Sequence, residues 1–205
     1  MTAVVGGLNV SRETMADLEK FTALVLKWTL KINLISAAAQ VDIWDRHVVD
    51  SVQIYQYAPA DYHSWLDIGS GGGFPGIVAA VLAKEFAPNA RFILIESDQR
   101  KATFLRTAIR ELTLNASVTA DRIENVSCLN ADVVSARALG SLPLLLPLIS
   151  SHLAPNGVAI LHKGKQVDPE VAEARQDWRF DLEERPSLTD PDGRILLIQR
   201  ISRAA

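Results

Sequence analysis

The stretch "SWLDIGSGGGFPGI", residues 64–77, decides the fold of this 205-residue chain. A short apolar run at 64–68 contains Asp67, and five glycines fall within residues 67–76 before a second apolar run begins. A buried strand that enters a glycine-rich turn and then a helix is the first unit of a doubly wound parallel sheet, and glycine lets a ligand approach the main chain there. We therefore expect a ligand at this turn and a helix that starts at Phe74-Pro75.

The sequence that follows repeats this alternation of short apolar runs and longer amphipathic ones, which is typical of a parallel sheet covered by helices. We expect strands at 64–68, 91–96, 117–120, 132–136 and 158–163 and helices at about 75–86, 98–114, 141–153 and 168–177. Near the end, "WRFDLEER" and "RILLIQRI" flank the turn signal "PDG", which predicts an antiparallel hairpin. The sequence predicts an α/β fold with a mostly parallel, seven-stranded sheet.

Two helical stripes precede the glycine turn. Apolar residues recur three or four positions apart between Ser11 and Ile35, and again between Val41 and Tyr55, ending before Pro59. We expect two amphipathic helices that pack on the main domain. The predicted organisation is an N-terminal helical extension at 1–60 and a main domain at 61–205.

Composition and charge exclude several classes of protein. Hydrophobic residues make up 48% and charged residues 22%, as in an ordinary globular domain. The net charge of -3 argues against a nucleic-acid partner, but residues 168–192 alone carry nine acids and three arginines, so the remainder has 18 bases against 15 acids. The lone Cys128, the absence of a basic leader and the absence of a long apolar run favour a cytosolic location.

The acid at the start of the glycine turn separates two possible ligands. Residues 71–76, "GGGFPG", match the dinucleotide pattern GxGxxG, which would indicate an NAD-dependent oxidoreductase. A pyrophosphate would be repelled by Asp67, whereas S-adenosylmethionine carries a sulfonium and an ammonium and no phosphate. The form D-x-G-x-G-x-G therefore favours S-adenosylmethionine; its members are Asp67, Gly69, Gly71 and Gly73.

Two further positions suit the same ligand. Glu96 ends the second predicted strand, where an adenosine ribose presents its hydroxyls. After the third strand, Ile123 and Glu124 offer an apolar contact and backbone hydrogen bonds for an adenine, although they also fit an ordinary helix start.

With these pieces placed, the whole chain resembles the bacterial glucose-inhibited division protein B family, the 16S ribosomal RNA guanine-N7 methyltransferases. The motifs that carry the resemblance are "NLIS" (33–36), "RHVVDS" (46–51), "DIGSGGGFPGI" (67–77), "ESDQRKATFLR" (96–106), "SARALGSL" (135–142) and "HKGK" (162–165). The resemblance implies a class I S-adenosylmethionine-dependent methyltransferase fold, which is Rossmann-like. It also implies S-adenosyl-L-methionine as donor, S-adenosyl-L-homocysteine as product, and a guanine in a decoding-region loop of small-subunit rRNA as acceptor.

The resemblance also assigns roles to residues. It implies cofactor contacts for Gly69, Phe74, Ile123, Glu124 and Arg137. It places Arg46 and Lys163 on the substrate side, where Lys165 would join them. This chain departs from the family in two places, with Glu96-Ser97 where Asp-Ser is common and Lys165 where glutamine is common.

The chemistry of this reaction requires no general base, because guanine N7 has a lone pair and loses no proton when it is methylated. Catalysis then depends on holding donor and acceptor in line, and on donors to guanine O6. Arg137 and Lys163 follow or end strands whose tips share the rim of the glycine turn, so we expect both to be catalytic. Their alternatives are a surface ion pair for Arg137 and an exposed strand-end lysine for Lys163.

Other features leave their function open. The basic run Arg100, Lys101, Arg106 and Arg110 could follow RNA phosphates or simply solvate a helix. The histidines at 63, 152 and 162 show no ligand spacing, so we expect no metal. A non-catalytic RNA-binding module on the same fold is a further alternative. The predicted partner is 16S rRNA or the small subunit, bound by a monomer.

Overall fold

The computed structural model of the protein describes residues 2–137 and 139–204. Its main sheet has seven strands in the order β5-β4-β3-β6-β7-β9-β8. Pairing is parallel from β5 to β7 and antiparallel for β7 with β9 and for β9 with β8, which confirms the predicted topology. The strands are β3 (Ser64–Ile68), β4 (Arg91–Ile95), β5 (Ala116–Thr119), β6 (Ala131–Arg137), β7 (Leu153–Lys163), β8 (Trp178–Pro186) and β9 (Arg194–Arg203).

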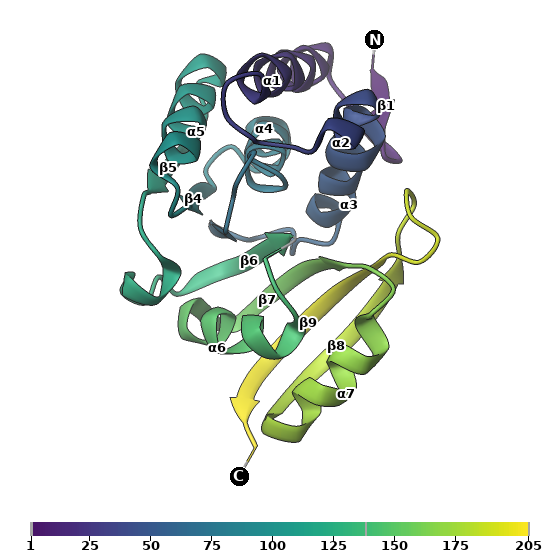
Figure 1. Ribbon diagram of the computed structural model, residues 1–205, viewed down its shortest axis with the longest axis vertical. Helices are drawn as coiled ribbons and strands as arrows, with labels where there is room; N and C mark the ends of the chain where they lie inside the picture. The colour runs from purple at the N-terminus through teal and green to yellow at the C-terminus, as the bar shows by residue number, and fades with distance from the viewer. Residues whose placement is uncertain (1, 138, 205) are drawn as a thin grey trace.

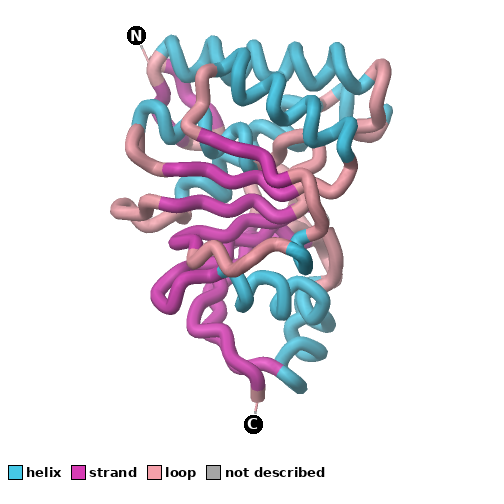
Figure 2. The backbone as a smooth tube through the Cα atoms, turned by 90° about the vertical axis from the view of Figure 1, so that its left-hand side faces the viewer, coloured by secondary structure: helices cyan, strands magenta, loops and turns pink. Residues whose placement is uncertain are grey.

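Helices cover both faces of this sheet (Figures 1 and 2). One face is covered by α1 (Arg12–Thr29), α3 (Asp50–Gln56), α4 (Gly76–Phe86) and α5 (Gln99–Leu112), and the other by α6 (Leu142–His152) and α7 (Val167–Asp177). Because successive strand residues point to opposite faces, Trp65 belongs to the core under α4 while Leu66 belongs to the core under α6. The same alternation decides which side chains reach the functional site.

The N-terminal helical extension is more broken than its periodicity predicts. The first helix ends at Thr29, although Ile35 beyond it is still buried. The second stripe forms three pieces: α2 (Ala37–Val41), a π-helix η1 (Trp44–Val49) and α3. The prediction of one continuous second helix is wrong because Asp42 leaves helical geometry, with φ -130° and ψ 40°, and because η1 winds more widely than an α-helix.

Two local features also differ from the predictions. A short hairpin of β1 (Ala3–Val5) and β2 (Leu8–Val10) begins the chain, and Gly6 and Gly7 at its turn adopt φ values of 54° and 83°. The Phe74–Pro75 bond is cis, and α4 begins at Gly76, one residue after Pro75.

Phe21 of α1 packs against Phe74 of the glycine turn, with ring centroids 5.1 Å apart. The extension therefore contacts the site directly, while the domain boundary at residue 60 stays a prediction. Within the described residues, none of the helices has the length and apolar character that crossing a membrane requires.

Candidate functional site

Three neighbouring cavities lie at the carboxyl ends of the parallel strands. The strand-tip cavity has a volume of about 390 Å³, the middle cavity about 300 Å³ and the helix-side cavity about 640 Å³, sizes that suit small ligands. Gly69, Gly71, Lys101 and Arg137 line both the strand-tip and the middle cavity. Ser36, Ala39, His47 and Arg137 line both the middle and the helix-side cavity. Arg137 thus borders all three.

The glycine turn forms the floor of the first two cavities. Gly69 and Gly71 adopt φ values of 68° and 51°, which a residue with a side chain rarely reaches. The predicted Gly73 differs from these two, because a Cβ there would lie 2.8 Å from Ile77 Cγ1 and from Phe21 Cζ. Gly73 therefore faces the core, and its role is to let the turn pack against α1 and α4.

The acid at the start of the glycine turn, Asp67, is buried beneath the turn. Its carboxylate is buried; Oδ1 accepts a hydrogen bond from Ser135 Oγ at 2.6 Å, and Ser135 Oγ also accepts one from Trp65 Nε1 at 2.8 Å. Oδ2 lies against Gly76, where a Cβ would come within 2.6 Å of it. Burial raises the pKa of Asp67 to about 6, although the bond from Ser135 Oγ opposes this, and Oδ2 has no hydrogen-bond partner among the described residues.

This placement bears on the predicted cofactor contact of Asp67, which stays a prediction. The side chain is not among the residues that line the three cavities, so the geometry gives it no direct contact with a ligand there. It occupies the N-terminus of α4, the position at which a dinucleotide-binding fold holds its phosphates. A pyrophosphate at this position would meet the Asp67 carboxylate, which lies against Gly76.

Glu96 and the residues after β5 form the wall of the strand-tip cavity. Glu96 is buried, and its two carboxylate oxygens accept bonds from Gly71 N and Asp98 N, both at 2.8 Å. These bonds hold the carboxylate at the cavity edge with lone pairs still available for hydroxyl groups. Ile123 and Glu124, in a short 3₁₀-helix (Ile123–Asn125), line the same cavity, and their contact with an adenine stays a prediction.

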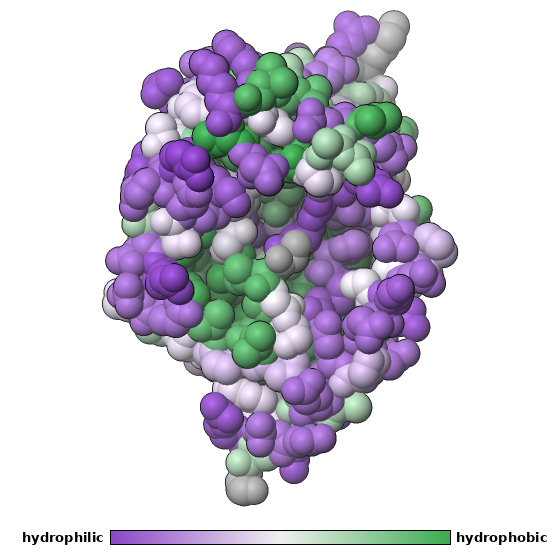
Figure 3. All heavy atoms as spheres, in the orientation of Figure 1, coloured by the Kyte–Doolittle hydropathy of each residue, from purple (hydrophilic) through white to green (hydrophobic). Residues whose placement is uncertain are grey.

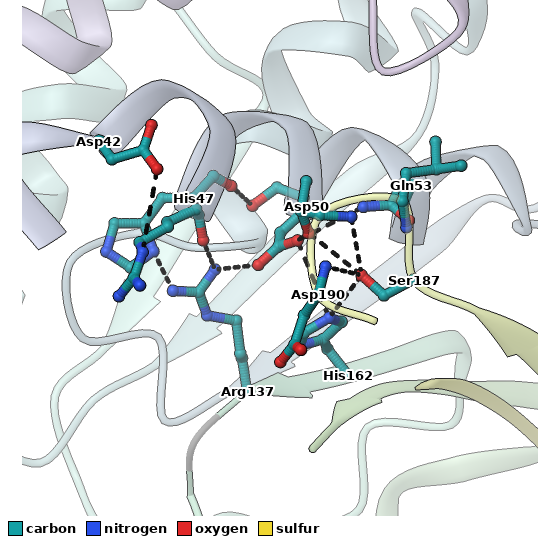
Figure 4. A network of polar contacts seen from close by, with 12 residues as sticks. Asp42, His47, Asp50, Gln53, Arg137, His162, Ser187 and Asp190 are labelled. Atoms are coloured by element: carbon teal, nitrogen blue, oxygen red, sulfur yellow. Dashed lines mark hydrogen bonds and ion pairs between the residues drawn. The ribbon is translucent and has the colours of Figure 1, made fainter. Parts of the chain in front are cut away.

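Arg137 is the centre of a buried polar network (Figure 4). Its guanidinium donates to the Arg46 carbonyl at 3.0 Å, lies 3.5 Å from Asp50 Oδ2 and contacts His47 Nδ1 closely. Burial lowers the pKa of Arg137, while the charges of Asp50 and Asp67 oppose that effect. The alternative of a surface ion pair is wrong, because only 16% of the Arg137 side chain is exposed.

His47 fixes one side of this arginine. Its ring stacks on Phe74 with centroids 4.8 Å apart. Burial and the adjacent Arg137 lower the pKa of His47 to about 4, so the ring is neutral near pH 7. With Nδ1 facing the guanidinium, the remaining proton is assigned to Nε2. His47 therefore orients Arg137 and is not available as a base.

Asp50 fixes the other side and joins three parts of the chain. Thr189, in the loop between β8 and β9, donates to Asp50 Oδ1, and His162 Nε2 lies 3.8 Å from the same oxygen. Gln53 Nε2 donates to it at 3.4 Å, and Gln53 Oε1 accepts from Leu188 N at 2.7 Å. The loop 187–193 is thereby attached to the helical extension across the helix-side cavity.

The three predicted substrate-side residues lie in different environments. Arg46 lines the helix-side cavity and is exposed, with a 4.0 Å pair to Asp42. Lys163 is buried; its Nζ donates to Gly140 O at 2.7 Å and lies 2.6 Å from Glu170 Oε2. Because this ion pair turns Lys163 away from the three cavities, its expected catalytic and substrate contacts do not follow from the geometry. Lys165 is exposed, one residue beyond Gly164 of the helix-side cavity.

No role was predicted from the sequence for several lining residues, namely Ser97, Asp121, Arg122 and Leu139 of the strand-tip cavity and Asp50, Thr189 and Asp190 of the helix-side cavity. Lys101 and His162 were considered only for RNA phosphates and for a metal, respectively. His47, beside Arg46, fits either the substrate side or a core-edge histidine by sequence, and the structure places it in the cavity wall. The motif "RHVVDS" held a signal, since His47 and Asp50 are three residues apart and share one helix side. Ala138 in the motif "SARALGSL" lies outside the described residues.

The family model described as rRNA small subunit methyltransferase G (GidB) matches residues 14–194. The chain belongs to this family. Its members include the ribosomal RNA small subunit methyltransferase G of Cereibacter sphaeroides, to which the chain is 51% identical over 98% of its own length and 97% of the relative's. The protein of that name from Ruegeria sp. is 47% identical, with 96% of this chain and 95% of the relative covered. The family resemblance predicted from the motifs is confirmed.

Solved structures with low sequence identity share the fold. TYW2 from M. jannaschii in complex with AdoMet aligns with a TM-score of 0.58 and 14% identity, over 77% of this chain and 76% of that one. TYW2 from P. horikoshii in complex with MeSAdo gives a TM-score of 0.57 at 14% identity, over 85% and 67%. The class I methyltransferase fold expected from the sequence is confirmed.

Proposed function

We propose that this chain is an S-adenosylmethionine-dependent methyltransferase that modifies N7 of a guanine in a decoding-region loop of 16S rRNA. The observation that carries the proposal is the position of Arg137, which borders three consecutive cavities and is held by His47 and Asp50. Membership of the rRNA small subunit methyltransferase G family supports the substrate. This substrate also agrees with the cytosolic location expected from the sequence.

The strand-tip and middle cavities fit the donor. Glu96 would accept from the ribose hydroxyls, and Ile123 and Glu124 would flank the adenine. Gly69 and Gly71 leave the main chain open to the methionine part, beside Phe74. Asp67 fills the phosphate position at α4, which favours this ligand over NAD. When bound, S-adenosylmethionine would supply an electrophilic methyl carbon on a sulfonium; the guanine N7 lone pair would bond to that carbon as the carbon–sulfur bond breaks and S-adenosylhomocysteine leaves.

The helix-side cavity fits the acceptor base. Arg137 stands where a base in this cavity faces the donor, so its guanidinium can donate to guanine O6 and hold N7 in line with the methyl carbon. No proton has to leave, and the residues agree with this requirement: His47 Nδ1 is taken up by Arg137, and Asp50 is bonded to Arg137 and Thr189. These side chains therefore position the base and do not abstract a proton.

The test uses small subunits from a strain that lacks its own enzyme. The purified chain is incubated with labelled S-adenosylmethionine and either these particles or naked 16S rRNA, and aniline cleavage then locates any N7-methylguanine. We expect one modified guanine in the decoding region. Donor binding without transfer to either substrate would support a non-catalytic RNA-binding module instead, and tight NADH binding without donor binding would support an oxidoreductase.

A further inference from the structure

The helix-side cavity contains a carboxylate that the methyl transfer itself does not use. We propose that Asp190 selects guanine by accepting hydrogen bonds from its N1–H and 2-amino groups. The inference rests on the proposed function and adds the residue that reads the identity of the base.

The position of Asp190 follows from the residues that line the two adjoining cavities. Four residues line both the middle and the helix-side cavity, and they mark the side that faces the donor. Asp190 lines only the helix-side cavity, as do Thr189, Pro191 and Gly164, and none of these four lines the middle cavity next to the donor. In Figure 4 its carboxylate points into the space between Arg137 and His162.

The loop 187–193 holds this carboxylate in place. Asp190 Oδ1 accepts from Asp192 N at 3.0 Å, Asp190 O accepts from Gly193 N at 2.9 Å, and Ser187 N donates to Gly193 O at 3.0 Å. Gly193 is buried, and a Cβ there would lie 3.0 Å from Asp190 Cβ. Burial lowers the pKa of the neighbouring His162, although the charges of Asp50 and Asp190 oppose this. Asp50 pairs with Arg137, whereas Asp190 has no ion pair within 4 Å in the described part of the chain. The Asp190 carboxylate therefore keeps acceptor capacity for a ligand.

The geometry of the reaction determines which edge of the base meets Asp190. A guanine that directs N7 and O6 toward the donor and Arg137 presents N1–H and its 2-amino group on the opposite edge. A carboxylate has only acceptors and can take both of these donors in parallel. Adenine presents the N1 acceptor at the same place, so its lone pair would face the carboxylate and leave a polar contact unmade.

The test combines a variant with a change in the base. Small subunits are assembled with 16S rRNA that carries either guanine or inosine, which lacks the 2-amino group, at the target position. We expect the parent enzyme to prefer guanine by ~10-fold in kcat/KM and Asp190→Asn to lose ~10- to 100-fold on guanine, with a guanine-to-inosine ratio near one. The affinity for S-adenosylmethionine, measured by calorimetry, should be unchanged.

Controls separate this role from a structural one. The amide of the Asp190→Asn variant keeps an acceptor for Asp192 N, so the loop should hold its conformation, and Asp190→Ser repeats the test with another side chain that can cap the turn. Asp192→Asn changes an exposed acid in the same loop and should leave both rates unchanged. A parent that methylates guanine alongside an Asp190→Asn variant with the same rate and the same ratio would overturn the inference alone. A parent inactive on both substrates would reject the proposed function and the inference together.

Discussion

The strand-tip cavity and the helix-side cavity share Arg137 but are built in different ways. The first is formed by the residues at the ends of β3, β4, β5 and β6, with Leu148 of α6, so most of its walls are short, continuous pieces of sequence. The second is assembled from the helical extension, the ends of β6 and β7, and the loop between β8 and β9. Its walls include Arg46, His162 and Thr189, which are far apart in the sequence.

The two cavities also differ in the groups that hold their polar side chains in place. In the strand-tip cavity, Glu96 takes its bonds from nearby backbone N–H groups, so the site is held by the main chain. The helix-side cavity is held by side chains, with Asp50 linking Arg137, Gln53 and Thr189. We infer that the first cavity is pre-formed by the fold, whereas the second depends on a few buried charges. Figure 3, in the orientation of Figure 1, shows a recess at the centre of the visible face of the molecule, with apolar surface gathered below it over α6.

The largest expected effect comes from the residue that both cavities share. Arg137→Ala should abolish transfer, a loss of at least ~100-fold in kcat, because it removes a positioned donor from the acceptor side. The protein should remain folded by circular dichroism. Arg46→Ala, which changes an exposed arginine of the same cavity, should have a smaller effect. A normal turnover of Arg137→Ala would remove this residue from the site.

A substitution at Asp67 tests whether this buried acid has a structural role. Its pKa of about 6 in the fold exceeds the ordinary value of 3.8, so the folded protein retains a proton that the unfolded chain loses between about pH 4 and 6. Its contribution to stability therefore falls as the pH rises through that window. Relative to Asp67→Asn, the parent should lose ~2–3 kcal/mol of unfolding free energy between pH 4 and 7, measured with urea. A difference that does not change with pH would contradict this account.

Glu96 tests the strand-tip cavity on its own. Glu96→Ala should weaken S-adenosylmethionine binding by ~10- to 100-fold in calorimetry, because the ribose hydroxyls lose a charged acceptor. Binding of the small subunit, which uses the other cavity, should stay the same. Glu96→Asp, which keeps a carboxylate one methylene shorter, should retain most of the affinity. Equal donor affinity in parent and Glu96→Ala would place the ribose elsewhere.

The smallest effects should separate two nearby lysines. Lys163→Met leaves Glu170 without its partner and should lower the unfolding free energy by ~1–3 kcal/mol, and adding Glu170→Gln should restore most of it. Lys165→Met should not change stability but should reduce the salt dependence of rRNA binding by about one charge. If Lys163→Met instead kept full stability and lost only transfer, the earlier expectation of a catalytic lysine would be right.

The corrections at the site share one cause, which is the alternation of side chains along strands. Position 163 lies on the same side of β7 as Leu161, in the core under α6 and α7, and therefore meets Glu170. His162 lies on the other side, toward the helical extension, and borders the helix-side cavity. Asp67 shares the side of Trp65 and turns toward α4. The ends of the strands could be predicted from the sequence, but the face of the sheet to which each side chain points could not.

By itself, the sequence determined the mostly parallel sheet with its terminal hairpin, the family, the glycine turn and the place of Glu96 at a strand end, because each is encoded in a continuous segment with its own periodicity or motif. Only the tertiary structure decided the helix-side cavity, since Asp50, Arg137, His162 and Asp190 meet there from four separate segments. It also decided that Asp67 and Lys163 are buried in polar contacts, because whether a charged side chain is exposed or paired depends on the elements packed against it.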